Sequence, residues 1–376
     1  MNKKKTGSTL AGLLLGLLVG GGAGVYIGTL LFALLRDDMA LPEYLLSLGG
    51  LLLGMTLSWY VQLVLHEGGH LVFGLLSGYR FSSFRIGSLM WMREGDRLRL
   101  RRFSLAGTGG QCLMAPPDWS EKFPYVLYNL GGVLMNLITA LLFWLISLLC
   151  PRLFWLWALL RTAAALGVAM ALLNGVPLRI GAADNDGRNV LSISRSREAR
   201  RAFWLQMKLN EQSSLGVRLR DMPAEWFELP PEEALDNPIV ASVAVFRCNR
   251  LMDEHRFEEA AALMERVCAL PAVPGVYDGM LCGDRLFCEL LGQRRRETLD
   301  ALNSRGQQKF MKAMKTNPSV LRTEYALSLL EEGDAEKAER LRAEFENAAA
   351  NYPYPQDVQA ERELLARADE AAALCT

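Results

Sequence analysis

Apolar residues crowd the first half of the chain, and charged residues crowd the second half. Four apolar runs are long enough to cross a bilayer, which takes about 20 residues of helix. They cover residues 10–35, 44–76, 123–149 and 153–173. Only a short turn at Pro151-Arg152 separates the last two runs, which predicts an antiparallel helical hairpin. The pattern predicts a mainly α protein, with a polytopic membrane bundle of about four spans.

The first run follows Lys3, Lys4 and Lys5, so a signal peptide is the alternative to a membrane span. Its apolar stretch is long for a signal peptide, and no clear small-residue cleavage site ends it. We therefore predict an uncleaved span. Glycine recurs along the run at Gly12, Gly16, Gly20, Gly24 and Gly28. This spacing predicts a smooth helix face for a close neighbour rather than a functional site.

Lysine and arginine in short loops predict the orientation of the spans. The amino end carries three lysines, and the segment between the second and third runs carries Arg80, Arg85, Arg93, Arg97, Arg99, Arg101, Arg102 and Lys122. The opposite side carries only Arg36 and Arg152. We therefore expect a multi-pass protein of the cell membrane with both termini in the cytosol. Arg161 lies inside the fourth run, where a charge needs a partner or an outward path.

Residues 81–103 do not show a helical pattern. Leu98 and Leu100 alternate with arginines, which is the period of a strand, and Glu94-Gly95-Asp96 supplies a turn. We predict a small β-hairpin at the cytosolic surface, with a merely solvated basic loop as the alternative. Such a hairpin would offer an edge strand to which an extended peptide can add.

From about Ser192 the chain is polar and rich in helical patterns. Residues 251–270 and 325–352 resemble tetratricopeptide-type helix pairs, with alanines where helices meet. Only two such units occur and their spacing is irregular, so an ordinary α-helical bundle is the alternative. Pro230-Pro231 predicts an internal break. We predict a membrane-embedded domain over residues 1–191 and a cytosolic α-helical domain over residues 192–376, which binds a protein partner or gates the first domain.

Composition narrows the classes of function. The formal net charge is zero and no basic stripe with interleaved aromatic residues occurs, so nucleic-acid binding is not expected. The seven cysteines include no CxxC pair, which argues against a disulfide framework. Those in the polar half are Cys248, Cys268, Cys282, Cys288 and Cys375. Their number predicts a reducing compartment for that half.

Two of the three histidines form the segment His66-Glu67-Gly68-Gly69-His70 inside the second run. Residues four apart share one face of a helix, so both imidazoles can bind one zinc ion. Glu67 flanks the first histidine and can take a proton from an attacking water. These residue types are costly inside a membrane helix and are functional there by default. A structural ion pair would explain Glu67, but not two histidines on one face.

Gly68 and Gly69 fill the two free positions of the motif. Each lowers helix stability by about 1 kcal/mol relative to alanine, so a reason is needed. Space for a partner helix or a substrate strand is one explanation. A local kink in the long helix is the alternative.

A catalytic zinc ion takes three protein ligands, and the motif supplies two. His255 lies in a distant charged segment and is predicted to face solvent. The other candidates are carboxylates after the fourth run, where Pro177 ends the helix. Asp186 is followed by glycine, as in a turn that can aim a carboxylate back at the motif. Asp184 is its rival. This segment and the histidines both lie toward the predicted cytosolic side.

On these residues the chain resembles the site-2 proteases, which are polytopic zinc metalloproteases that cut membrane-embedded or membrane-proximal substrates. The matching elements are His66-Glu67-x-x-His70, Gly132-x-x-x-Asn136, Asn174-x-x-Pro177 and Asp186-Gly187. The match covers roughly residues 45–190. The stretch from Pro177 to Asp186 is longer than in the family's short versions, which keeps Asp184 open as a ligand.

The resemblance implies a function and a set of roles. His66, His70 and Asp186 would hold Zn²⁺, and Glu67 would be the general base. Asn136 and Asn174 would orient the substrate or the site. We therefore expect an endopeptidase that acts on membrane proteins or peptides. The alternatives are a non-catalytic membrane scaffold with a structural zinc site, and a prenyl-protein-type endoprotease whose third ligand is a helix glutamate.

Overall fold

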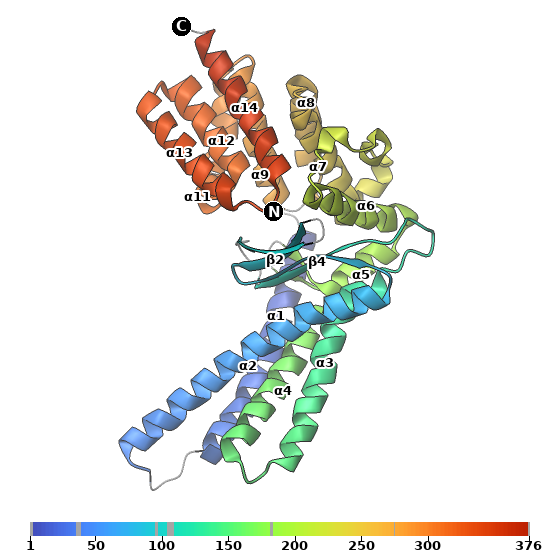
Figure 1. Ribbon diagram of the computed structural model, residues 1–376, viewed down its shortest axis with the longest axis vertical. Helices are drawn as coiled ribbons and strands as arrows, with labels where there is room; N and C mark the ends of the chain where they lie inside the picture. The colour runs from blue at the N-terminus through green and yellow to red at the C-terminus, as the bar shows by residue number, and fades with distance from the viewer. Residues whose placement is uncertain are drawn as a thin grey trace. The chain divides into compact units, whose positions relative to one another are not determined.

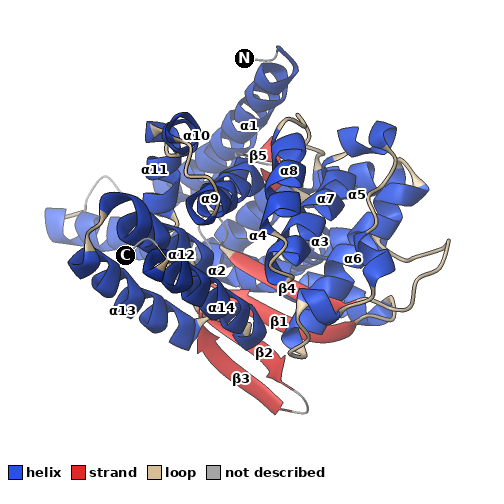
Figure 2. Cartoon of the chain, turned by 90° about the horizontal axis from the view of Figure 1, so that it is seen from above, coloured by secondary structure: helices blue, strands red, loops and turns tan. Residues whose placement is uncertain are grey.

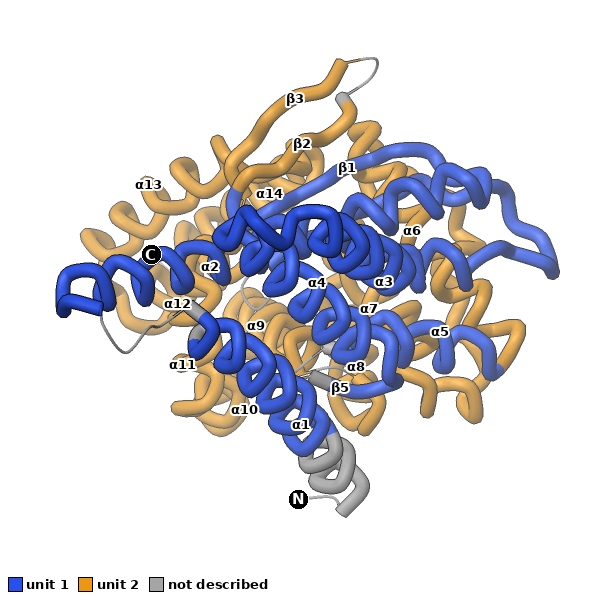
Figure 3. The backbone as a smooth tube through the Cα atoms, turned by 90° about the horizontal axis from the view of Figure 1, so that it is seen from below, with its two compact units in different colours: residues 1–88, 105–195 blue, residues 89–104, 196–376 orange. Residues whose placement is uncertain are grey.

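The computed structural model describes residues 3–34, 39–94, 97–103, 109–180, 183–273 and 275–374. These residues are mainly helical, as predicted, with a small four-stranded antiparallel sheet. They fall into two compact units (Figure 3). The first unit comprises residues 1–88 and 105–195, and the second comprises residues 89–104 and 196–376.

Four long helices of the first unit carry the four apolar runs. They are α1 (Lys3–Leu34), α2 (Leu41–Leu76), α3 (Val126–Leu149) and α4 (Phe154–Gly175). Each holds a segment long and apolar enough to cross a membrane, which indicates a membrane protein. The helices α3 and α4 form the predicted antiparallel hairpin (Figure 1). Arg36 lies outside the described residues.

Helix α2 is the longest element. Its 36 residues correspond to about 54 Å, well beyond a hydrocarbon core of about 30 Å. Pro42 stands in the first turn, where a missing N–H costs no hydrogen bond. The helix ends at Leu76, and the chain turns away from it through Gly78, whose φ of +86° suits glycine. No break occurs at Gly68 and Gly69, so both histidines of the motif stand on one continuous helix.

Strands β1 (Arg80–Ile86) and β4 (Gly110–Ala115) of the first unit pair antiparallel, with Phe84 opposite Cys112. The pair is tied to the helices, because the Tyr128 hydroxyl of α3 donates to the Cys112 carbonyl over 2.8 Å. After α4 come the short strands β5 (Arg179–Ile180) and β6 (Ala183–Asp184), and then helix α5 (Asp186–Ser194). This arrangement brings β4 and α5 to the end of the helical bundle.

Strands β2 (Leu89–Glu94) and β3 (Arg97–Arg102) form a hairpin, seen in Figure 2. Leu98 faces Arg93 across it. The prediction of a hairpin within residues 81–103 is confirmed for these two strands, whereas residues 81–86 belong to a further strand, β1, which lies between β2 and β4 in the sheet. Alternation shows that a segment is a strand, but it does not identify the partner. The predicted turn residues Gly95 and Asp96 lie outside the described residues.

Besides β2 and β3, the second unit consists of an α-helical domain. Its helices are α6 (Arg197–Ser214), α7 (Pro238–Asp253), α8 (Phe257–Cys268), α9 (Gly275–Leu291), α10 (Arg296–Leu302), α11 (Arg305–Ala313), α12 (Pro318–Leu327), α13 (Ala335–Asn351) and α14 (Pro355–Ala373). Short 3₁₀-helices lie at Leu219–Asp221, Ala224–Phe227 and Glu232–Asp236, and a π-helical segment lies at Ser328–Glu332. Leu286, Phe287 and Phe345 are fully buried in its core. The likeness to tetratricopeptide repeats stays a prediction.

Candidate metal centre

The three residues of the motif are buried on one face of α2. His66 and Glu67 are 6% and 8% exposed, and the side chain of His70 is 12% exposed. The Nε2 atoms of His66 and His70 lie 3.3 Å apart, because residues four apart stand one above the other on a helix. The motif thus presents two imidazole nitrogens to one point.

Asp186 reaches the same point from the start of α5. Its Oδ2 atom lies 3.2 Å from Nε2 of His66 and 3.5 Å from Nε2 of His70. Burial raises the pKa of the Asp186 carboxyl, but the two histidines, when they are protonated, lower that pKa by a larger amount, to about 2. The carboxyl is therefore an anion at neutral pH. We call these three residues the His66–His70–Asp186 cluster, and its ligand atoms are close enough to hold one metal ion.

Hydrogen bonds fix which nitrogen of each histidine is free. Nδ1 of His66 donates to Oδ1 of Asn136 over 2.6 Å, and Nδ1 of His70 donates to the Tyr128 carbonyl over 2.8 Å. These oxygens accept and cannot donate, so the proton of each neutral imidazole is on Nδ1. Each Nε2 then keeps a lone pair. Two lone pairs and a carboxylate oxygen converge, which is how protein ligands meet a cation.

A chain of buried amides holds Asn136 in this orientation. Gln62 of α2 donates through Nε2 to the Ala163 carbonyl over 2.8 Å, so its Oε1 atom must face the other way. Nδ2 of Asn136 donates to that Oε1 atom over 2.7 Å, which leaves Oδ1 of Asn136 for His66. The sequence analysis missed Gln62. A polar residue one helical turn before His66, in an apolar run, was the available signal.

Glycines permit close approach around the cluster. A Cβ atom on Gly69 would lie 2.3 Å from the Gly131 carbonyl oxygen, so α2 and α3 touch through bare backbone. A Cβ atom on Gly132 would lie 2.5 Å from the His66 ring. A Cβ atom on Gly68 would meet nothing within 4 Å. The explanation by a partner helix therefore applies to Gly69, whereas Gly68 borders open space.

Asn185 positions Asp186. Its Oδ1 atom caps α5 by accepting from the Arg188 N–H over 3.0 Å, and it also accepts from the Leu178 N–H over 3.0 Å. Its Nδ2 atom donates to the Leu173 carbonyl of α4 over 2.7 Å. This one amide joins the end of α4 to the start of α5, and the sequence analysis missed it. An asparagine before a helical segment is a common cap and was the available signal.

The prediction of a turn at Asp186-Gly187 is wrong, because both residues begin helix α5. Glycine is needed there for another reason. A Cβ atom on Gly187 would lie 2.0 Å from the Gly175 carbonyl oxygen at the end of α4. The dipeptide therefore brings two helix ends together and does not reverse the chain.

The other predicted residues lie as follows. Asp184 does not join the cluster: its Oδ1 atom lies 3.4 Å from Nε of Arg179 and 3.3 Å from Nε of Arg188. Nδ2 of Asn174 donates to the Met170 carbonyl within its own helix over 3.0 Å. The structure thus brings Asp186 and Asn136 to the histidines, but neither Asp184 nor the side chain of Asn174.

Glu67 lies beside the first residue of β4. A Cβ atom on Gly110 would be 2.7 Å from Oε1 of Glu67. Arg85 of β1 is 1% exposed and donates to the Gly87 and Gly110 carbonyls over 2.7 and 3.3 Å. Burial lowers the pKa of Arg85, and the nearby Glu67 carboxylate opposes that change. The sequence analysis counted Arg85 among the loop charges, whereas the structure buries it next to the motif.

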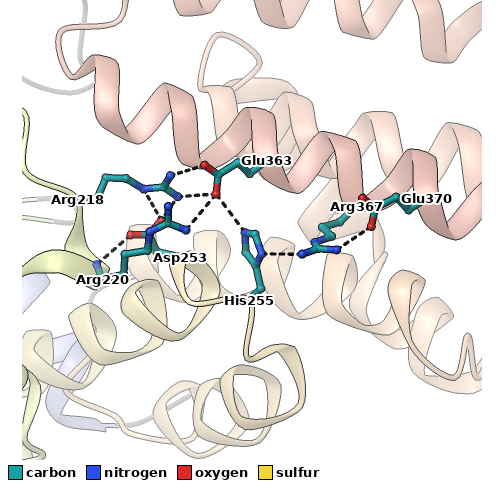
Figure 4. A network of polar contacts seen from close by, with 7 residues as sticks. All are labelled: Arg218, Arg220, Asp253, His255, Glu363, Arg367 and Glu370. Atoms are coloured by element: carbon teal, nitrogen blue, oxygen red, sulfur yellow. Dashed lines mark hydrogen bonds and ion pairs between the residues drawn. The ribbon is translucent and has the colours of Figure 1, made fainter.

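Two further charged residues have partners that the sequence did not predict. Arg161 of α4 donates to the Ser147 hydroxyl over 2.8 Å, and its guanidinium lies over the rings of Trp144 and Trp157. His255 is half-buried in the second unit, where it stacks on Phe257 and lies 3.5 Å from Glu363 (Figure 4). The prediction that His255 faces solvent is therefore wrong, because the network around Glu363 draws it in.

Comparison with known proteins adds no relative. No protein-family model, curated protein or solved structure matches the chain. The resemblance to the site-2 proteases therefore stays a prediction that rests on the residues described above.

Proposed function

We propose that the chain is an intramembrane zinc metalloprotease, which hydrolyses peptide bonds of membrane-embedded or membrane-proximal proteins. The observation that carries the proposal is the buried triangle of the His66–His70–Asp186 cluster, with edges of 3.2, 3.3 and 3.5 Å. Zinc binds such ligands at about 2.0–2.2 Å with tetrahedral geometry, which separates the ligands by about 3.3–3.6 Å. The triangle fits one zinc ion with the fourth position left for water.

Bound there, zinc would supply Lewis acidity and lower the pKa of a water to about 7. Glu67 follows His66 directly and does not belong to the triangle, so its carboxylate is available as a general base. It takes a proton from the attacking water and later delivers it to the leaving amine. Asn136 keeps His66 in its ligand tautomer throughout.

Strand β4 is the element best placed to hold a substrate in extended form. It pairs with β1 and with no other described strand, so its second edge has no strand partner among the described residues. Gly110 at its start lies against Glu67. A substrate strand added to that edge would pass the general base with its peptide bonds exposed, which a helical substrate cannot do. This role, predicted for a hairpin over residues 81–103, is better suited to β4.

Orientation and partners belong to the same proposal. The lysines and arginines of the loops favour a multi-pass protein of the cell membrane with both termini cytosolic. The site then acts at the cytosolic face of the bilayer. The second unit would be a cytosolic domain that recruits a protein partner or gates access to the site.

The decisive experiment replaces the proposed base. Glu67→Gln should retain zinc and abolish the cleavage of co-expressed, epitope-tagged single-span proteins, because the amide cannot take a proton. Glu43→Gln, the same change at the exposed start of α2, is the matched control and should cleave normally. Undiminished proteolysis by Glu67→Gln would refute the mechanism. The same inactive protein can trap bound substrates for identification.

A non-catalytic scaffold is the second candidate, and the size of the second unit favours it. Zinc without cleavage across a broad set of single-span substrates would support that reading. A prenyl-protein-type endoprotease has less support, because within the described residues the third group beside the histidines is an aspartate. Retention of zinc by Asp186→Ala would revive it.

A further inference from the structure

The second unit contains a cavity that the proposed proteolysis does not use. Its volume is about 300 Å³, and its walls come from α6, α7, α9, α12 and α14. This volume is at the lower end of the range of small-ligand sites, so the cavity admits a side chain rather than a folded element. Helices far apart in the sequence line it, and together they can present several chemical groups to one ligand.

The charged groups of the cavity are unbalanced. Six charged side chains line it: Arg218, Arg322, Asp253, Asp284, Asp357 and Glu361. Four acidic and two basic groups give a formal charge of −2. A cavity of this kind favours a cationic ligand, since a low-dielectric wall strengthens the attraction.

Both arginines of the cavity are already neutralised. Nε of Arg218 lies 3.1 Å from Oδ1 of Asp253, and Figure 4 shows the same guanidinium bound to Glu363. Arg322 donates to Asp284 over 2.5 Å and to Glu361 over 2.9 Å. Neither arginine is left to balance Asp357.

Asp357 is the carboxylate of the cavity that forms no ion pair in the described part of the chain, although the guanidinium of Arg218 lies near enough to lower its pKa slightly. Within the described residues its side chain makes no hydrogen bond and no ion pair. Burial raises the pKa of its carboxyl to about 7, and the nearby Glu361 and Asp253 add to that shift. An aspartate in the first turn of α14 would ordinarily be explained by the helix dipole. That explanation does not account for the two further acids, Glu361 and Asp253, that lie near the same carboxyl.

Neutral polar groups and aromatic rings complete the lining. The amide side chains of Asn210, Asn249 and Gln356 have no partner among the described residues. Free amides can donate to and accept from a peptide backbone. Tyr277 and Tyr352 also line the cavity, and aromatic faces attract cations. The set matches a cation that is attached to a backbone.

We propose that this cavity binds a lysine or arginine side chain of a peptide segment, with Asp357 as its counter-ion and the free amides on the peptide backbone. The proposal is independent of the metal centre. It gives the second unit a definite ligand chemistry, that of a basic peptide, in place of an unspecified partner.

The test uses the full-length protein in detergent micelles and the acetylated, amidated peptide Gly-Ser-Arg-Ser-Gly, titrated calorimetrically. The citrulline peptide is the neutral control of equal size. The arginine peptide should bind at least about tenfold more tightly, because its guanidinium is charged and forms stronger hydrogen bonds with a carboxylate than neutral citrulline does. Equal affinities for the two peptides would overturn the proposal.

Variants assign the effect to the cavity. Asp357→Asn should weaken the arginine peptide about tenfold or more. Asp300→Asn, at an exposed site on α10, should leave binding unchanged. Ala360→Leu should block the cavity by volume while keeping the carboxylate, which covers the case in which Asp357→Asn does not fold. Full affinity in both cavity variants would exclude this site.

Two further measurements complete the test. The first asks whether the cation must be part of a peptide, and the second distinguishes this proposal from the proposed proteolysis. Agmatine carries the guanidinium without a peptide backbone and should bind more weakly than the peptide. Equal binding of agmatine would overturn the peptide assignment in favour of a free amine. Glu67→Gln should bind the arginine peptide normally, so failure of the proteolysis hypothesis and failure of this one give different results.

Discussion

Both units bury polar side chains, but the two sets end differently. In the first unit, the amides of Gln62 and Asn136 orient His66. The Nε2 atoms of His66 and His70 and a carboxylate oxygen of Asp186 converge there, and none of these three atoms carries a hydrogen to donate. In the second unit, Arg322 is 1% exposed, yet it is bound by Asp284 and Glu361 and lies over the Phe287 ring. A network in which every buried polar group has a hydrogen-bond partner stabilises a core. A group of acceptors that face one another without a hydrogen between them is stable only when a cation binds among them.

The largest effect on zinc content and cleavage is expected when one member of the His66–His70–Asp186 cluster is removed. Asp186→Ala should remove zinc and lower cleavage about a thousandfold or more, because removing one member of a group that acts as a unit disables the whole. Asp184→Ala should keep both zinc and cleavage, since Asp184 pairs with Arg179 and Arg188. Zinc content by mass spectrometry checks both. The reverse pattern would make Asp184 the ligand.

The satisfied network should respond in stability instead. Arg322→Met leaves Asp284 and Glu361 as buried, unpaired carboxylates, and we expect a loss of about 3–5 kcal/mol in the free energy of unfolding of the second unit. Urea titration followed by tryptophan fluorescence measures it. Arg296→Met removes an exposed pair and should cost at most about 1 kcal/mol. Equal costs would erase the distinction between the two networks.

Replacing an amide that orients His66 should weaken zinc binding without abolishing it. Gln62→Ala releases Asn136 without removing a ligand, and we expect zinc affinity to fall about 10–100-fold, as is usual for groups that orient a ligand. Thr56→Ala, an exposed hydroxyl on the same helix, is the control. Competition with a zinc chelator gives the affinities. Unchanged affinity in Gln62→Ala would show that Asn136 needs no support.

Asp357 is an exception among the buried polar groups of the second unit, because its carboxyl has no hydrogen-bond partner or ion pair among the described residues. Its pKa is about 7 when folded, facing Glu361, Asp253 and Arg218. In the unfolded chain the carboxyl loses its proton near pH 4. Between about pH 4 and pH 7 the folded state therefore binds this proton more tightly than the unfolded state does. Stability of the second unit should therefore fall as the pH rises from about 4 to 7. Unfolding at pH 5 and pH 7.5 should differ less in Asp357→Asn than in the natural protein.

The sequence predicted the parts that depend on local pattern. Apolar runs identified the four long helices, and spacing placed His66 and His70 on one face. It could not predict contacts made by unrelated segments. Nothing near Gln62 indicates Asn136 as its partner, and Asp186 reaches the histidines only because Asn185 joins two helix ends. Alternation likewise could not show that β1 pairs with β4, since pairing depends on where helices place each strand.

The smallest effect, a change in stability, is expected from replacing the glycines of the motif. It distinguishes the two explanations of these glycines, close packing against a partner helix and a kink in α2. Gly68→Ala meets no neighbour and should raise helix stability by up to about 1 kcal/mol, with zinc retained. Gly69→Ala drives a methyl group into the Gly131 carbonyl and should lower the unfolding temperature of the first unit. If the glycines served a kink instead, both changes would straighten α2 and would affect stability alike. Thermal unfolding of the matched pair distinguishes these cases, because close approach of α2 to α3 requires only Gly69.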